Sequence, residues 1–166
     1  NKINYEIIDW KKDLLAIVDI YDEITEILDI FVGQESISIS EVANNCEHIQ
    51  NIIDTLYSLD VFNEVKEIAI DFAMAELESN EEIAQYIPEE VFTELKENGS
   101  ETLFHELSTI INLFKDLNEK TTLISSLNDY LLSEDPDAKF VLDIDPMLVN
   151  ILADYIDESD IAQPII

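Results

Sequence analysis

Residues 18–30, VDIYDEITEILDI, decide how the N-terminal part of the chain is expected to fold. Apolar side chains recur in and around this stretch at steps of three and four residues, which is the period of one face of an α-helix. They are Ile17, Ile20, Tyr21, Ile24, Ile27, Leu28 and Phe31. We predict that this face packs on the core of a helical protein, and that Trp10 joins it.

The same stretch contains five carboxylates and no Lys or Arg; they are Asp19, Asp22, Glu23, Glu26 and Asp29. The period places them opposite the apolar face. Like charges three or four residues apart on a helix cost about 0.2–0.5 kcal/mol per pair. Because a domain is stable by only about 5–15 kcal/mol, several unrelieved pairs indicate that the acids serve a partner.

The whole chain has the same character. Its 166 residues include 38 Asp and Glu against 8 Lys, with no Arg, and the net charge is −30. Residues 1–79 contain 18 of the acids and residues 80–166 contain 20, so the charge covers the fold and does not form an acidic tail. With 47% hydrophobic residues, the chain is too apolar for a disordered protein.

Two Gly and four Pro in 166 residues indicate long helices and few tight turns. We predict a mainly α protein, a compact multi-helix bundle of about seven to eight helices with at most two short strands, for which 36–40 (SISIS) and 140–144 (FVLDI) are the candidates. The joint 79–82 divides the chain into helical halves 1–79 and 80–166, or the two form one continuous domain. Helices are expected at 5–32, 41–46, 48–59, 61–79, 81–87, 88–99, 101–118, 121–133 and 146–158, with end signals at Gly33, Asp60, Gly99, Ser100 and Asp145.

The motifs of enzyme and metal sites are incomplete. FHELST at 104–109 has Thr109 where a zinc protease helix needs its second His. A calcium loop starting at Asp135 would have Lys139, Phe140 and Pro146 at positions that need a ligand, Gly and Glu. We therefore expect no enzyme activity, no cofactor and no metal.

The compartment is predicted from what the sequence contains. Cys46 is the single cysteine, which rules out an intrachain disulfide and fits a reducing compartment. No apolar run reaches the ~20 residues of a membrane span. The charge would also repel anionic lipid and nucleic acid. We expect a cytoplasmic protein, in the host cell if phage-encoded, without direct membrane or nucleic-acid contacts.

Carboxylates in this arrangement can imitate a phosphate backbone. Side chains four residues apart on a helix have Cβ atoms about 5–6 Å apart, and each DNA strand has one charge per ~3.4 Å. Lys and Arg selected to hold phosphates would accept carboxylates through charge-assisted hydrogen bonds. In composition and size the chain resembles the nucleic-acid-mimicking inhibitors of phages and mobile elements, which include anti-restriction and anti-CRISPR proteins.

We therefore predict an inhibitor that occupies the basic DNA- or RNA-binding cleft of a host defence enzyme. Its expected partner is a basic nucleic-acid-binding protein, and a homodimer is also possible. Partner-binding residues are expected in two groups: Asp19, Asp22, Glu23, Glu26 and Asp29, and near the C-terminus Glu134, Asp135, Asp137, Asp143 and Asp145.

Three other interpretations stay open. The chain could be an immunity protein or antitoxin that neutralises a basic nuclease toxin. It could be a phage assembly factor or a chaperone for a basic partner. An acidic surface is also typical of halophile proteins, although the abundance of Ile argues against this origin.

Overall fold

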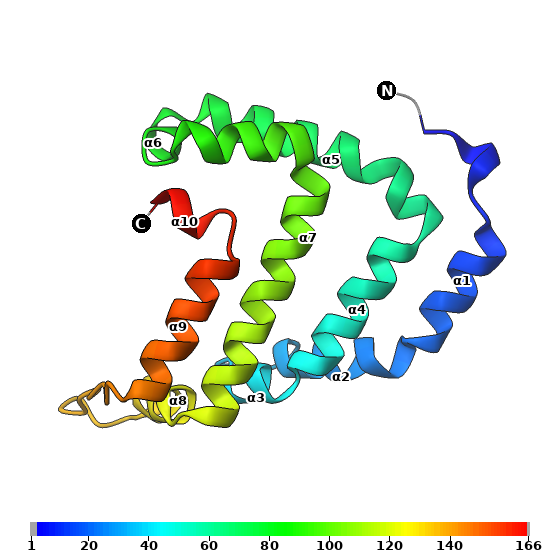
Figure 1. Ribbon diagram of the computed structural model, residues 1–166. Coiled ribbons are helices and arrows are strands. Elements are labelled where there is room, and N and C mark those ends of the chain that lie inside the picture. The colour runs from blue at the N-terminus through cyan, green and yellow to red at the C-terminus, as the bar shows by residue number, and fades with distance from the viewer. Residues whose placement is uncertain (1–2, 166) are drawn as a thin grey trace.

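The computed structural model describes residues 3–165 and confirms a mainly α multi-helix bundle (Figure 1). Seven helices within these residues have seven or more residues each, and none of the described residues forms a strand. No described helix is both long and apolar enough to cross a bilayer. The elements are η1 (Tyr5–Ile7), α1 (Trp10–Asp19), α2 (Tyr21–Phe31), α3 (Ile39–Asn44), α4 (Cys46–Ser58), α5 (Asp60–Ser79), α6 (Glu81–Ala84), α7 (Glu89–Lys120), α8 (Leu123–Leu132), α9 (Pro146–Glu158) and α10 (Ala162–Ile165).

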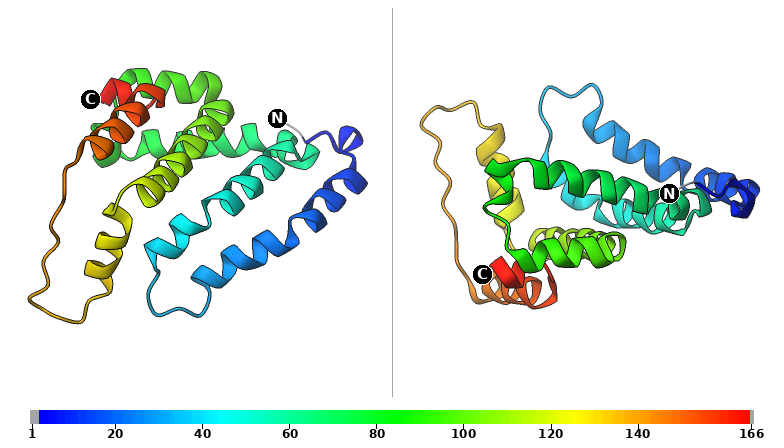
Figure 2. Two further views of the ribbon diagram at one scale, coloured as in Figure 1. Left: turned by 60° about the horizontal axis from the view of Figure 1, so that its bottom comes forward. Right: turned by 90° about the horizontal axis from the view of Figure 1, so that it is seen from above.

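The longer helices form an array (Figures 1 and 2). Helix α9, the C-terminal part of α7 and α4 lie side by side, and α2 packs against α4. Helix α5 and the N-terminal part of α7 lie at one end of this array, and α3 and α8 lie at the other. The α2–α3 connection and the loop 133–145 are at that same second end.

A small cluster of buried apolar side chains lies where α3, α7, α8 and α9 meet. Its buried members are Ala43, Leu117, Ile124, Leu148 and Ile151. Ala43 comes from the first predicted half and the other four from the second, so the two halves share this cluster. The division at 79–82 itself stays a prediction.

The array leaves a large surface in contact with water. The accessible surface is 11366 Å², whereas a folded monomer of 19.0 kDa exposes about 8,400 Å² by the usual scaling with mass. Many of the exposed side chains are large and apolar, particularly on α1 and α2. The exposed surface is therefore both larger and richer in apolar side chains than is usual for a monomer of this mass.

Two predicted helix ends are confirmed. The Asp145 carboxylate accepts a hydrogen bond from Leu148 N at 2.7 Å, and Pro146 is the first residue of α9. Gly33 follows α2 with φ of 76°, the left-handed conformation that glycine adopts without strain. Both signals depend on local backbone geometry, which explains why the sequence predicts them well.

The single helix predicted over 5–32 is wrong. A 3-10 turn precedes α1, whose N-cap is Asp9, accepting from Lys12 N at 3.0 Å. The chain then bends at Ile20 (φ −103°, ψ 11°), between α1 and α2. The Ile20 side chain is buried at the bend. Neither Gly nor Pro marks this position, so the bend follows from packing and has no local signal.

The predicted cap of α5 is also wrong, because Asp60 does not cap its own helix. The Asp13 carboxylate, on α1, accepts hydrogen bonds from Asp60 N (2.9 Å) and Val61 N (2.8 Å). The Asp60 carboxylate turns back to Asp9 N and Lys12, and its hydrogen bond with the Lys12 ammonium lowers the pKa of Asp60. The first turn of α5 is therefore capped from a residue 47 positions earlier.

Neither strand candidate forms a strand. Within 36–40, Ser38 accepts from Glu41 N and caps α3, which already includes residues 39 and 40. Residues 140–144 run as a connection to α9 without a strand partner among the described residues. An alternating pattern forms a strand only beside another extended segment, and the bundle offers none.

Helix α7 crosses the predicted break at Gly99 with a kink instead of an end. Asn98 has non-helical angles (φ −132°, ψ 28°). Gly99 is buried against α5, where an added Cβ would lie 2.6 Å from Ile70 Cγ2. Glycine is needed there for the close approach of α7 to α5, and Ser100 does not act as a separate N-cap.

We expect Gly99→Ala to lower the free energy of unfolding by about 1–3 kcal/mol, because the new methyl group overlaps the Ile70 side chain. Urea denaturation followed by circular dichroism measures the change. Ile70→Ala removes the overlapping carbon. The double variant should therefore lose less free energy of unfolding than the sum of the losses in the two single variants. Additive losses would show that the approach of the two helices does not depend on this contact.

Candidate interaction surface

The first predicted group of acids lies along α2 and the end of α1, and the structure separates it into two kinds. Asp19, Asp22 and Asp29 are exposed to solvent. Glu23 instead faces α4, where its Oε1 accepts from Asn51 Nδ2 at 2.8 Å and lies 3.4 Å from His48 Nδ1. Glu26 Oε2 lies 3.1 Å from His48 Nε2, although the Glu26 side chain is mostly exposed. The expectation that all five point away from the core is therefore wrong for Glu23.

The apolar face of this segment is also rotated from its predicted position. Ile20 and Ile30 are buried, and Ile24 and Ile27 are half-buried, so isoleucines form the face that packs inward. Tyr21, Leu28 and Phe31 were expected to join them but are 65%, 52% and 44% exposed. Trp10, another predicted core residue, is 48% exposed. The difference arises because α2 packs mainly on α4, which covers one narrow side of the helix.

The outward side of α1 and α2 has its own apolar pattern, which we name the outer stripe. Its members are spaced by four, three, four, three and four residues: Leu14, Val18, Tyr21, Thr25, Leu28 and Val32. All are exposed. From Val18 to Leu28, each is followed directly by an acid, and these flanking acids are Asp19, Asp22, Glu26 and Asp29. The single apolar face predicted from the sequence combined two members of this stripe, Tyr21 and Leu28, with the isoleucines that pack inward.

The second predicted group of acids lies in the loop between α8 and α9. Glu134, Asp135 and Asp137 are exposed, and Asp135 Oδ1 accepts from Asp137 N at 2.9 Å within the loop. Asp143 is exposed, whereas Asp145 is partly occupied as the N-cap of α9. This loop and the C-terminal end of α2 are at the same end of the molecule (Figures 1 and 2).

Few of the carboxylates have a cationic partner. Among residues 3–163, four Lys–carboxylate pairs come within 4 Å: Lys12–Asp60, Lys96–Glu78, Lys115–Glu47 and Lys120–Asp116. His48 adds contacts to Glu23 and Glu26. Most of the 38 acids are thus exposed without a cation near them. The surface is an array of anionic groups that another molecule's cations could reach.

Two acids are buried, and both cap backbone. Asp13 caps α5, as described above. Glu106 Oε2 accepts from Ser159 Oγ at 2.7 Å, and its Oε1 accepts from Asp160 N at 2.8 Å and Ile161 N at 3.3 Å. Glu106 therefore holds the segment after α9 against α7. Neither role was predicted, because a capping partner distant in sequence gives no local signal.

His105, Glu106 and Asp160 together resemble a metal-ligand set, since one ligand atom of each lies within 4.8 Å of the others. The hydrogen bonds of Glu106 already occupy both of its oxygens. His105 Nε2 lies 2.7 Å from the Glu158 carbonyl, which is at the C-terminal end of α9. This cluster is best explained as a network that closes the C-terminal segment.

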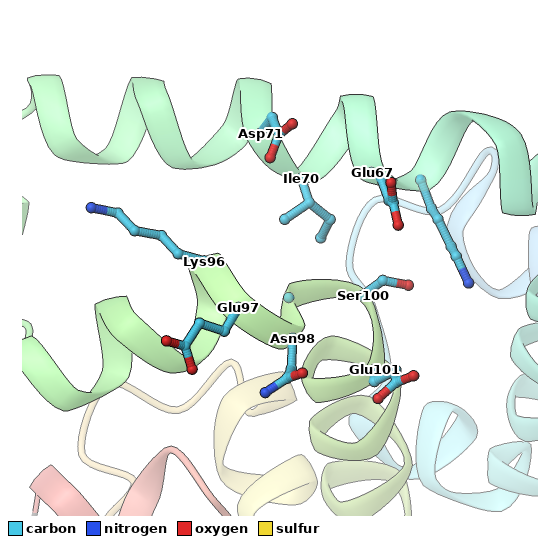
Figure 3. Close-up of a pocket in the computed structure, with 10 residues that line it drawn as sticks. Glu67, Ile70, Asp71, Lys96, Glu97, Asn98, Ser100 and Glu101 are labelled. Carbon is cyan, nitrogen blue, oxygen red and sulfur yellow. The ribbon is translucent and has the colours of Figure 1, made fainter. Parts of the chain in front are cut away.

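The kink of α7 forms one side of a cleft of about 340 Å³ against α5 (Figure 3). Glu67 and Asp71 lie on the α5 side, and Lys96, Glu97 and Glu101 on the α7 side. The lining has charges of both signs at the surface. Lys96 is also paired with Glu78, so the cleft does not concentrate one charge for a phosphate or a cation.

Comparison of the chain with protein-family models, with curated proteins and with solved structures gave no match.

The melting temperature should rise with ionic strength, because salt screens the repulsion within a surface of net charge −30 over about 8–10 Å. Recovery of about 1–2 kcal/mol would raise it by ~2–8 °C between 20 and 300 mM NaCl. Differential scanning calorimetry measures the shift, with tetramethylammonium chloride as a control for specific sodium binding. A flat or falling melting temperature would contradict unrelieved repulsion.

The stability contributed by His105 should depend on pH. Its hydrogen bond to the Glu158 carbonyl, assisted by nearby carboxylates, raises the pKa of His105 above its ordinary value of about 6.5. A raised pKa means that the folded state favours the protonated ring. The contribution is therefore complete below the unfolded-state pKa and is lost as pH rises through the folded-state pKa.

We expect His105→Gln to lower the free energy of unfolding more at pH 5.5 than at pH 8.5, as measured by urea denaturation at both pH values. Proton NMR titration of the wild-type ring gives the folded-state pKa directly. An equal loss at the two pH values would show that the imidazolium adds nothing beyond the neutral hydrogen bond.

Proposed function

We propose that the protein is an acidic inhibitor that imitates nucleic acid and occupies the basic DNA- or RNA-binding cleft of a host defence enzyme, of the anti-restriction or anti-CRISPR type. The observation that supports this proposal is the excess of exposed carboxylates without cationic partners. A chain selected only for stability would relieve part of this repulsion with Lys or Arg. A binding cleft for phosphates would supply those cations in the complex.

The spacing on α2 is compatible with such a cleft. Asp22, Glu26 and Asp29 follow one another at axial rises of about 4.5–6 Å, and one DNA strand has a charge every ~3.4 Å. The exposed acids of the loop 133–145, at the same end of the molecule, extend the anionic surface beyond one helix. Long-range attraction to a basic partner would make association fast.

A second candidate is supported by a different observation. The outer stripe exposes apolar side chains between the acids, and a phosphate-binding cleft does not require such groups. An immunity protein, an antitoxin or a chaperone of a basic protein would use both kinds of side chain. These roles share the basic partner and differ in whether nucleic acid competes for the same site.

The proposal is tested by capture and competition. The immobilised protein is incubated with nuclease-treated host lysate, and retained proteins are challenged with a short DNA duplex at constant ionic strength. We expect duplex to release a nucleic-acid-binding protein, because both ligands use one cleft. Retained proteins that duplex does not displace would argue against mimicry and in favour of the second candidate.

We expect the variant Asp22→Asn, Glu26→Gln, Asp29→Asn to bind the captured protein at least tenfold more weakly, since it loses three contacts to cations. Glu23 is left in place because it contacts α4. Affinity is measured by biolayer interferometry, and circular dichroism checks the fold. The matched control Glu81→Gln, Glu82→Gln, Glu89→Gln removes three exposed charges elsewhere. Equal losses in both variants would mean that only net charge matters, and no loss in either would exclude α2 as a contact.

A further inference from the structure

We propose that the outer stripe of α1 and α2 is a docking surface for a basic amphipathic helix of a partner protein. The inference deepens the proposed function, on which it rests for the existence of a basic partner. It adds which element of that partner binds here and by what chemistry. The contact would be apolar along its centre and ionic along one edge.

The exposure of the stripe is the first argument. Leu14, Val18 and Tyr21 are 64%, 67% and 65% exposed, and Leu28 and Val32 continue the series at 52% and 67%. Single exposed apolar side chains are ordinary, but a series of them along two consecutive helices, α1 and α2, is typical of an interface. Helix α2 contacts α4 and α3, and α1 contacts α5 and α2, and all six members of the stripe stay exposed beside these contacts.

The spacing of the stripe indicates what shape of partner fits. The five steps of four, three, four, three and four residues average 3.6, the period of the α-helix, so the stripe keeps to one side as it advances. The eighteen residue steps from Leu14 to Val32 would measure about 27 Å along a straight helix, and the bend at Ile20 between α1 and α2 makes this an upper bound. A partner helix of about five turns would therefore cover the stripe, inserting its own apolar side chains between those of the stripe.

Charge complementarity identifies the chemistry of the occupant. The flanking acids lie one residue beyond the stripe members, so they form one edge of it. Asp19, Asp22 and Asp29 have no Lys or His within 4 Å among residues 3–163. A partner helix with Lys or Arg beside its apolar face would neutralise this edge. A second copy of the chain would instead bring another net charge of −30 to the interface.

A designed peptide serves as the probe. It is a fluorescein-labelled 21-residue helix with Leu at the heptad a and d positions, Lys and Arg beside them, and no Trp. One control peptide has the same composition in scrambled order, and another has Glu in place of Lys and Arg. Fluorescence anisotropy of the labelled peptide gives the affinity. In a separate titration with unlabelled peptide, the fluorescence emission of Trp10 reports binding, because Trp10 lies one turn before Leu14 on the same helix.

We expect the heptad peptide to bind at least tenfold more tightly than the scrambled one, and the acidic peptide not to bind. The variant Val18→Gln, Tyr21→Gln, Leu28→Gln should weaken binding at least tenfold. Because these residues are exposed, the variant should keep its fold. The control Tyr86→Gln, Val141→Gln, Ile144→Gln removes three apolar side chains that are even more exposed, from other segments, and should bind normally.

Several outcomes would overturn the proposal. Equal binding of the heptad and scrambled peptides would mean that charge alone attracts them. Sedimentation showing a dimer that the stripe variant dissociates would make the occupant a second copy, and a Trp10 shift on zwitterionic vesicles would make it a membrane. The peptide assay contains no nucleic-acid-binding protein, so it tests the docking surface independently of nucleic-acid mimicry. If the heptad peptide binds but duplex does not release the captured protein, mimicry is refuted and the docking surface is not. If duplex releases the captured protein but the heptad peptide does not bind, the docking surface is refuted and mimicry is not.

Discussion

The hydration of carboxylates constrains this structure more than any other interaction. An ionised carboxylate leaves water only when hydrogen bonds or cations replace its solvation, and the chain has eight Lys for 38 acids. Nearly all of the acids must therefore reach the surface. A protein of this length meets that demand with an array of helices and a small core, which gives it an accessible surface well above that of an ordinary monomer of its mass.

The two buried acids show the exception to this constraint. Asp13 and Glu106 are each held by backbone N–H groups, which replace water without any cation. In doing so they tie together parts of the chain that are distant in sequence: α1 to the start of α5, and α7 to the segment after α9. In a chain so poor in Lys, hydrogen bonds from backbone N–H groups to carboxylates connect distant segments that ion pairs connect in other proteins.

Acids and apolar residues also share the outer side of α1 and α2. The isoleucines of this segment pack inward, so the remaining apolar residues and the acids other than Glu23 are left exposed. On such a surface the carboxylates would attract cationic groups at long range, and the apolar side chains would make contacts at short range. Association by such a surface would be steered by charge and retained by desolvation of the stripe.

The class of fold, the positions of most helices and the anionic character of the surface could be predicted from the sequence. These follow from composition, from the period of apolar residues and from local caps such as Asp145 and Gly33. The tertiary structure alone decided the bend at Ile20, the close approach at Gly99, the capping role of Asp13 and the contact of Glu23 with α4. Each of these features depends on which helix packs against the residue. A 3.6-residue period of apolar side chains shows that a helix has an inward face, but it does not show how wide that face is or which element covers it.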